Sequence, residues 1–209
     1  MDISEITQLL KPFVELSADQ LRQVATHLDL LLKWNSKVNL TSVRRPEEIV
    51  SRHYGESFFV ARELLRSEAA ASIVDVGSGA GFPGIPFAIF APGARVVLVE
   101  STSKKAAFLN ESIFALGLHN AQVFDGRAES YPKASADLVA MRAVERFEKA
   151  LPVADGLVKL GGRIALMIGE NQVELGKSLL KTMAWQKAVP VPGGISRVLL
   201  TGTKTSNVE

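Results

Sequence analysis

The sequence contains no cysteine, and it has no unbroken apolar run of the roughly 18 residues that a membrane-spanning helix needs. The first absence excludes a disulfide-stabilised fold, a thiolate metal site and a cysteine nucleophile. The basic region that opens a secretory signal is also missing, because Asp2 and Glu5 stand in its place. We therefore expect a cytoplasmic protein with no membrane partner, and we expect no metal ion at its site.

A large excess of charge of either sign is absent as well. The chain has 24 Lys and Arg residues against 22 Asp and Glu residues, which gives a formal net charge of only +2. This charge is too small for a protein that binds nucleic acid over its whole surface, so any RNA contact must come from a local patch, and DNA is not an expected partner. With 47% hydrophobic and 22% charged residues, the 209-residue chain has the composition of one globular domain with an extension.

Residues 1–66 have the pattern of a helical N-terminal cap. Ser17 and Gln20 have the spacing of a capping box, and apolar residues follow at helical intervals. Pro46 suits the first turn of a helix, and the two acidic residues after it suit the positive end of the helix dipole. The sequence thus predicts one long helix after Ser17 and another from Pro46 to the end of the cap.

From residue 72 onward the pattern changes to short apolar runs separated by stretches of helical length. Such runs are typical of strands buried on both faces, and their alternation with helices predicts a mostly parallel α/β sheet over residues 67–209. Near the C-terminus, two strand-like stretches are separated only by residues 191–196, too few for a helical crossover, so we expect an antiparallel edge strand. The expected strands are 73–76, 96–99, 121–124, 138–140, 164–168, 185–190 and 197–203, and the expected helices are 84–90, 103–116, 145–159 and 170–183.

The strongest local motif is a glycine-rich turn after the first predicted strand. Gly77, Gly79 and Gly81 permit positive φ angles and the close approach of a ligand to the main chain. Their G-x-G-x-G spacing differs from the dinucleotide fingerprint, whose third glycine would fall at Phe82. Asp75, just before the turn, would repel a pyrophosphate but attract a cation. These features favour S-adenosylmethionine, which carries an ammonium and a sulfonium, over NAD.

Two further stretches fall at the same edge of the predicted sheet. Glu100 ends the second predicted strand, where a carboxylate can accept hydrogen bonds from both hydroxyls of a ribose. Ala128 and Glu129 lie in the loop after the third strand, which could border an adenine ring. The sequence therefore predicts a cofactor site formed by Asp75, the three glycines, Glu100 and this loop.

Five groups of residues carry a resemblance to a known family. They are Leu32-Lys33-Trp34-Asn35, Val38-Asn39-Leu40-Thr41-Ser42-Val43, Arg52-His53, the run from Asp75 to Pro86, and Met141-Arg142-Ala143. Over roughly residues 20–204 the chain resembles the RsmG family, also called GidB. Members of that family use S-adenosylmethionine to methylate N7 of a guanosine in the 530 loop of 16S ribosomal RNA.

The resemblance implies a class I, Rossmann-like methyltransferase sheet preceded by a helical cap, with 16S ribosomal RNA or the small ribosomal subunit as partner. It also implies that Gly77, Phe82, Ala128, Glu129 and Arg142 contact the cofactor, with Glu100 standing where many members have Asp. The chain departs from the family pattern at Ile168, Met141 and Val198, where Lys, Ser and His are common. We expect these differences to bear on contacts with the target and not on the cofactor.

Arg142 is the expected catalytic residue. It follows a predicted strand at the cofactor edge and could donate to guanine O6 or to a phosphate while N7 stays free; the alternative is a surface ion pair with Glu145 or Glu148. His53 could contact the substrate, or it could be a buried helix residue whose ring nitrogens are satisfied by neighbours. Because N7 has no proton to lose, the transfer needs positioning and not a general base.

A basic series in the cap predicts the RNA-binding surface. Trp34 and His53 are interleaved with it, although Trp34 has the spacing of a core residue and nearby acidic residues offset the charge. The resemblance favours RNA contact. The residues expected to bind RNA are Lys33, Lys37, Arg44, Arg45, Arg52, His53 and Arg197.

Two other functions remain possible from the sequence. A small-molecule methyltransferase could use the same fold, although the basic series and the lack of an evident apolar lid weigh against it. A ribosome-assembly factor could bind RNA and retain a vestigial cofactor pocket, but it would be expected to have lost the glycine turn or the acid after the second strand. The sequence keeps both features.

Overall fold

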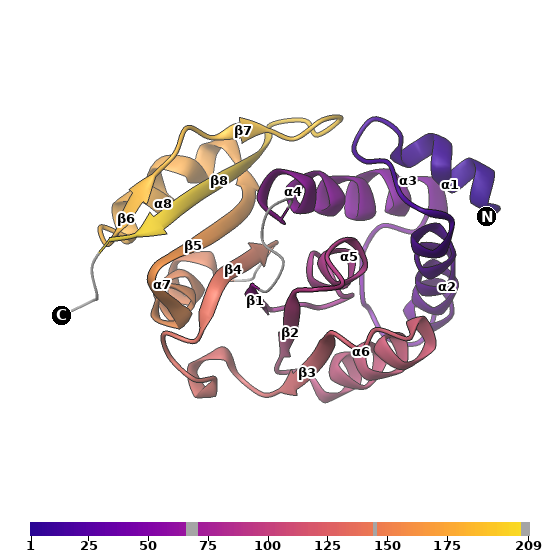
Figure 1. Cartoon of the computed structure of the whole chain (residues 1–209), viewed down its shortest axis with the longest axis horizontal. Coiled ribbons are helices and arrows are strands. Elements are labelled where there is room, and N and C mark those ends of the chain that lie inside the picture. The colour runs from indigo at the N-terminus through magenta and orange to yellow at the C-terminus, as the bar shows by residue number, and fades with distance from the viewer. Residues whose placement is uncertain (66–70, 144–145, 206–209) are drawn as a thin grey trace.

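The computed structural model describes residues 1–65, 71–143 and 146–205, and its centre is a twisted sheet with helices on both faces (Figure 1). The predicted positions Arg66 and Glu145 and the tail 206–209 lie outside the described residues. The strand order is β3-β2-β1-β4-β5-β8-β6, with β7 also paired to β8. The strands are β1 (Ser72–Val76), β2 (Arg95–Glu100), β3 (Ala121–Asp125), β4 (Ala136–Arg142), β5 (Val158–Gly169), β6 (Met183–Trp185), β7 (Val189–Pro190) and β8 (Arg197–Lys204).

The first five strands pair in parallel, which confirms the predicted α/β sheet. Each crossover contains a helix near the expected place, apart from the short loop and 3-10 turn between β3 and β4. The helices α5 (Gly84–Phe90) and α6 (Ser103–Leu116) have the predicted bounds, and α7 (Phe147–Leu157) is slightly shorter than predicted. The carboxyl ends of β1, β2 and β4 therefore meet at one edge of the sheet.

The C-terminal part differs in detail from the prediction. The expected helix 170–183 is a 3-10 turn, η3 (Glu170–Gln172), followed by the short α8 (Val173–Leu179), because the chain must turn back to place buried Met183 at the start of β6. The expected strand 185–190 is split into β6 and β7, which share the outer side of β8. The antiparallel strand β8 thus lies one place in from the edge, between β5 and β6.

Alternate residues of the central strands supply two separate cores. Ile73, Leu98 and Ala140 face the core formed with α5, α6 and the N-terminal helices, whereas Val74, Val97 and neighbours on that side face α7 and α8. This period of two is what a sheet covered on both faces requires. The N-terminal helices are consequently part of the packing of the central sheet.

The N-terminal segment consists of α1 (Ile3–Leu10), α2 (Ala18–Asn35), α3 (Pro46–Ile49), the π-helix η1 (Val50–Gly55) and α4 (Glu56–Leu65) (Figure 1). The predicted capping box of Ser17 and Gln20 is present. Asp2 and Glu5 form a second capping box that begins α1. The division of the chain into a cap and a methyltransferase domain at residue 66 stays a prediction.

The continuous helix expected after Pro46 is interrupted by the π-helix η1. Its wider turn places Tyr54 in the core with no exposed surface, while Arg52 and His53 reach a cavity at the sheet edge. π-turns of this kind are rare overall, and those that occur are often found at functional sites. Among the described residues, no helix combines the length and the apolar composition needed to cross a membrane.

Candidate active site

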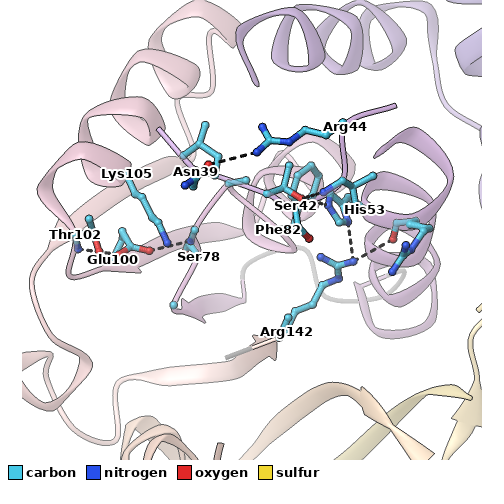
Figure 2. A pocket seen from close by; sticks show the side chains of 18 of the residues that line it. Asn39, Ser42, Arg44, His53, Ser78, Phe82, Glu100, Thr102, Lys105 and Arg142 are labelled. Atoms are coloured by element: carbon cyan, nitrogen blue, oxygen red, sulfur yellow. Dashed lines mark hydrogen bonds between the residues drawn. The ribbon is translucent and has the colours of Figure 1, made fainter. Parts of the chain in front are cut away.

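A cavity of about 920 Å³ opens at the carboxyl ends of β1, β2 and β4 (Figure 2). The glycine turn and the end of β2 form one wall. The loop between α2 and α3 (residues 39–44) and the π-helix form the opposite wall, and Arg142 and Arg197 enter from the sheet. The cavity is therefore shared between the N-terminal segment and the central sheet.

The glycine turn is held against the neighbouring strand by backbone hydrogen bonds. The N–H groups of Gly77 and Ser78 both donate to the carbonyl oxygen of Val99, at 2.9 and 3.1 Å. Gly79 has a φ of +55°, and a Cβ atom added there would meet no protein atom closer than 3.8 Å. Its missing side chain thus leaves open space on the cavity side, as a ligand-binding turn requires.

Gly81 is a glycine for a different reason. Its φ is +88°, and an added Cβ would lie 2.5 Å from Cδ1 of Ile85. It does not line the cavity, so the structure assigns its lack of a side chain to packing under the turn and not to cofactor contact.

Glu100 lies at the cavity wall, as the sequence predicts. Its Oε2 accepts a hydrogen bond from Gly79 N at 3.0 Å, and its Oε1 accepts one from Thr102 N at 2.8 Å (Figure 2). The carboxylate is therefore fixed between the glycine turn and the start of α6. A fixed acceptor at this strand end has the position suited to ribose hydroxyls.

The structure corrects the role expected for Asp75. The side chain is fully buried beneath the turn and does not line the cavity, so it offers no direct contact to a cationic ligand. Its Oδ2 accepts a hydrogen bond at 2.9 Å from Gly84 N, at the start of α5. Burial raises the pKa of this carboxyl to about 7, although the Gly84 and Ser78 hydrogen bonds oppose the shift. Asp75 is thus a structural acid that joins β1 to α5.

Ala128 and Glu129 lie beside the cavity and not in its present lining. They form the 3-10 turn η2 (Ala128–Ser130) after β3, where Ala128 packs on the second core and the exposed Glu129 is 3.7 Å from Arg127 Nε. Their contact with an adenine ring stays a prediction. Phe82, by contrast, lines the cavity, and its ring centroid lies 5.1 Å from that of His53.

Arg142 is held by a buried network that the sequence did not predict. Its Nη2 donates to Nδ1 of His53 at 2.9 Å and to Oε2 of Glu56 at 3.1 Å, and the side chain is only 9% exposed. Glu148 is not its partner, and Glu145 lies outside the described residues, so an ordinary surface ion pair does not describe this arginine. The guanidinium from β4 is enclosed by two residues of the N-terminal segment.

His53 is a buried residue with both ring nitrogens satisfied, which was one of the two interpretations left open by the sequence. Because an arginine can only donate, Nδ1 must be the unprotonated acceptor, and Nε2–H then donates to Oγ1 of Thr41 at 2.8 Å. Burial, together with the positive charges of Arg142, Arg52 and Arg197, lowers the pKa of His53 to about 3. The ring is therefore neutral at physiological pH.

Asn35 and Thr41 fix the loop that forms the cap wall. Oδ1 of Asn35 accepts hydrogen bonds from Leu40 N and Thr41 N, both at 3.0 Å, and its Nδ2 donates to Thr41 O. Thr41 Oγ1 connects this loop to His53. Sequence reasoning quoted both residues only as part of a family motif and gave neither of them a role.

The basic series is divided by the fold. Arg44, Arg52 and Arg197 line the cavity, together with Lys105, which the sequence analysis missed (Figure 2 labels Arg44 and Lys105). Three other predicted RNA-binding residues do not line it, namely the exposed Lys33, Lys37 and Arg45. Trp34 packs against the core and donates from Nε1 to Glu111, which favours the core interpretation over base stacking.

We expect the contribution of Asp75 to the free energy of unfolding to fall as pH rises from about 4 to about 7, opposite in sign to the contributions of His27 and His53, whose pKa values are lowered to about 3. The folded-state pKa of Asp75, raised from 3.8 to about 7, means that the folded protein retains a proton which the unfolded chain loses over this interval. The slope is up to about 1.4 kcal/mol per pH unit. Asp75→Asn, whose amide oxygen can still accept from Gly84 N, should remove this contribution, so that its stability in urea unfolding experiments rises with pH by up to about 1.4 kcal/mol per pH unit more than that of wild type.

Asp137→Asn is the matched control for this measurement. Ser72 and Lys159 lower the pKa of Asp137 to about 2, so its contribution is present above the unfolded pKa and is lost only at lower pH. Its removal should leave the slope between about pH 4 and about pH 7 unchanged. An equal slope in wild type and Asp75→Asn would contradict the raised pKa.

Comparisons with known proteins agree with this geometry. The model of the GidB family, described as rRNA small subunit methyltransferase G, matches residues 20–192. The chain is 43% identical over 152 residues to "Ribosomal RNA small subunit methyltransferase G" of Nitrosomonas europaea, covering 71% of this chain and 69% of that protein. It is 33% identical over 197 residues to the protein of the same name from Halorhodospira halophila, covering 92% of each.

The fold agrees with that of solved methyltransferases. The structure of a SAM-dependent methyltransferase from Aquifex aeolicus has a TM-score of 0.60 at 16% identity, covering 79% of this chain and 96% of that one. Together with the family match over most of the sequence, these findings show that the chain belongs to the GidB family of rRNA small subunit methyltransferases G.

Proposed function

We propose that this protein transfers a methyl group from S-adenosylmethionine to N7 of a guanine in the 530 loop of 16S ribosomal RNA. The observation that carries the proposal is a single cavity in which a cofactor-type glycine turn meets cationic side chains from several segments. At about 920 Å³ it is at the upper end of the size of small-molecule sites, so it has room for a cofactor and for part of a second substrate.

The residues present fit S-adenosylmethionine. Gly79 leaves space against the main chain, Glu100 offers a fixed carboxylate, and Phe82 supplies an apolar wall. When bound, this cofactor supplies an electrophilic methyl group on a positively charged sulfur. Gly77, Gly79, Phe82 and Glu100 would hold it.

The chain's own groups would position the guanine and the RNA. Guanine N7 has an in-plane lone pair and carries no proton, so the methyl transfer needs no general base. A neutral His53 that takes no part in proton transfer agrees with this chemistry. Arg142 can donate to the O6 beside N7, as arginine does in other guanine contacts. Arg44, Arg52 and Lys105 line the cavity and suit phosphate groups.

The natural substrate under this proposal is 16S ribosomal RNA, either free or within the small ribosomal subunit, and the working compartment is the cytoplasm. The choice of substrate rests on the family and on the basic cavity, and the compartment follows from the substrate. The relatives named as small-subunit rRNA methyltransferases support the class of RNA.

The proposal is tested by incubating the protein with radiolabelled S-adenosylmethionine and unmodified 16S rRNA or small subunits. Borohydride and aniline cleavage then maps any N7-methylguanine. We expect one labelled guanine in the 530 loop. Label at another atom would contradict the N7 assignment, and tight RNA binding without label would favour the non-catalytic assembly factor.

Gly79→Ala should weaken the binding of the cofactor. The added methyl group enters the space that the ligand needs, and we expect the affinity for S-adenosylhomocysteine in calorimetry to fall at least about tenfold, or 1.4 kcal/mol. Gly117→Ala is the matched control, because Gly117 also has a positive φ (+63° against +55°) and open space around its Cβ. Both variants bear similar backbone strain. Equal loss of affinity in the two would place the cofactor elsewhere.

The single-turnover rate at saturating RNA and cofactor should show no ionisation of His53. With a pKa of about 3, the ring does not change charge between about pH 6 and about pH 9. His53→Gln should therefore lower the rate by less than about tenfold, which is a smaller loss than removal of a general acid or base usually causes. The factor should be the same at each pH. Arg142→Ala should lower it far more. A bell-shaped profile that disappears in His53→Gln would contradict this mechanism.

A further inference from the structure

Glu56 is a buried acid that contacts two of the arginines lining the cavity, and the sequence analysis did not select it. It is the first residue of α4, directly after the π-helix, and it is only 3% exposed. Its Oε2 accepts hydrogen bonds from Nε and Nη2 of Arg142, at 3.4 and 3.1 Å, and lies 3.5 Å from Nη2 of Arg197. One carboxylate oxygen is thus shared by arginines from the end of β4 and the start of β8.

The buried Arg142 lies near two other cations, Arg197 and Arg52, and near one acid, Glu56. Burial lowers the pKa of Arg142, and Arg197 and Arg52 lower it further, whereas Glu56 raises it. Arg52 has a separate partner in Glu48, 2.6 Å away on the exposed side. Glu56 is therefore the acid that pairs with Arg142 and fixes its guanidinium in a place where cationic groups converge.

The contacts also limit what Arg142 can bind. Within the described residues, its hydrogen bonds use Nε and Nη2, with Arg52 O and His53 Nδ1 as the other acceptors. A carboxylate and a phosphate are the two groups whose geometry matches a guanidinium fork. Glu56 therefore occupies the edge of Arg142 that an RNA phosphate would otherwise take.

We infer that Glu56 is a positioning residue that withholds Arg142 and Arg197 from RNA phosphates, so that Arg142 remains directed at the base to be methylated. This inference rests on the proposed function for the identity of the substrate. Glu56 itself does not line the cavity, and it acts through the two arginines.

The inference predicts opposite effects on RNA binding and on methylation. Glu56→Gln removes the negative charge that pairs with the two arginines, so the logarithm of RNA affinity should depend more steeply on the logarithm of salt concentration, by about 0.7 for each additional phosphate contact. The single-turnover rate at saturating RNA should fall at least about tenfold, because Arg142 loses its orientation. A purely structural role would flatten the salt dependence or leave it unchanged.

The experiment uses filter binding of the full chain to unmodified 16S rRNA at several potassium chloride concentrations, with single-turnover methylation of the same RNA and calorimetry of S-adenosylhomocysteine. Cofactor affinity should stay within about twofold of wild type, since Glu56 does not touch the glycine turn. Glu63→Gln is the matched control, because it removes the same charge from the same helix at an exposed pair with Arg62, away from the cavity. It should leave slope and rate unchanged.

Glu56→Asp keeps the inference testable if Glu56→Gln does not fold. The shorter acid retains a charge beside Arg142 and should lose the longer contact to Arg197, so its salt slope should be steeper than that of wild type by about one phosphate contact. A slope equal to or flatter than wild type in every folded Glu56 variant would overturn the inference. An unchanged methylation rate in Glu56→Gln would overturn it as well.

Failure of this inference is distinguishable from failure of the proposed function. The salt dependence is an equilibrium measurement that does not require methyl transfer. If wild type leaves no N7-methylguanine in the RNA, the proposed function fails whatever the slopes are. If wild type methylates the RNA and the Glu56 variants behave like Glu63→Gln, only the role of Glu56 is wrong.

Discussion

Burial of the Arg142 guanidinium is the constraint on which the site depends. A buried charge is costly unless it is paired and hydrogen-bonded, and here the partners come from the N-terminal segment, as His53 and Glu56. The sheet therefore depends on the N-terminal segment to enclose this guanidinium at the edge where we propose that the reaction takes place. Thr41 extends the same network to the loop 39–44, so this loop, the π-helix and the end of β4 are joined by hydrogen bonds and not by apolar packing alone.

The π-helix explains how one short segment supplies these partners. In η1 and the first residue of α4, Tyr54 enters the core while His53 and Glu56 meet Arg142. Tyr54 OH also contacts Nδ1 of the buried His27 on α2, at 2.8 Å. The segment is therefore fixed both to Arg142 at the sheet edge and to α2 in the core. The rings of His53 and Tyr54 also lie 5.1 and 4.8 Å from that of Phe82, directly after the glycine turn, so the segment and the turn are held in one arrangement.

Much of the fold could be predicted from local sequence patterns. Apolar runs located the central strands, and helix boundaries at Gly84 and Ser103 followed from the segments between them. The C-terminal helix and strand were misplaced, because α8 is short and the chain reverses to bring Met183 into the sheet, which is a tertiary demand that the local pattern does not encode. The π-turn was also missed, because the local sequence does not distinguish a π-turn from a turn of ordinary α-helix.

The site was predicted where main-chain geometry determines it and missed where contacts between distant segments determine it. Gly79 and Glu100 lie where the motif places them. Asp75 has the right position in sequence but faces the interior, and Lys33 does not line the cavity, because spacing along the chain does not specify which side of an element faces a ligand. The pairing of Glu56 with Arg142 spans 86 residues, beyond the reach of any local signal.

The central claim is that the cap and the sheet form one substrate site, and hydrogen exchange of the protein with S-adenosylhomocysteine and unmodified 16S rRNA tests it most directly. The account predicts that the cofactor product protects the amides of the glycine turn and the end of β2. Addition of RNA should then protect the loop 39–44, the π-helix and the start of β8 together. Protection by RNA confined to the exposed surface around Lys33 and Lys37, with the cavity walls unchanged, would contradict it.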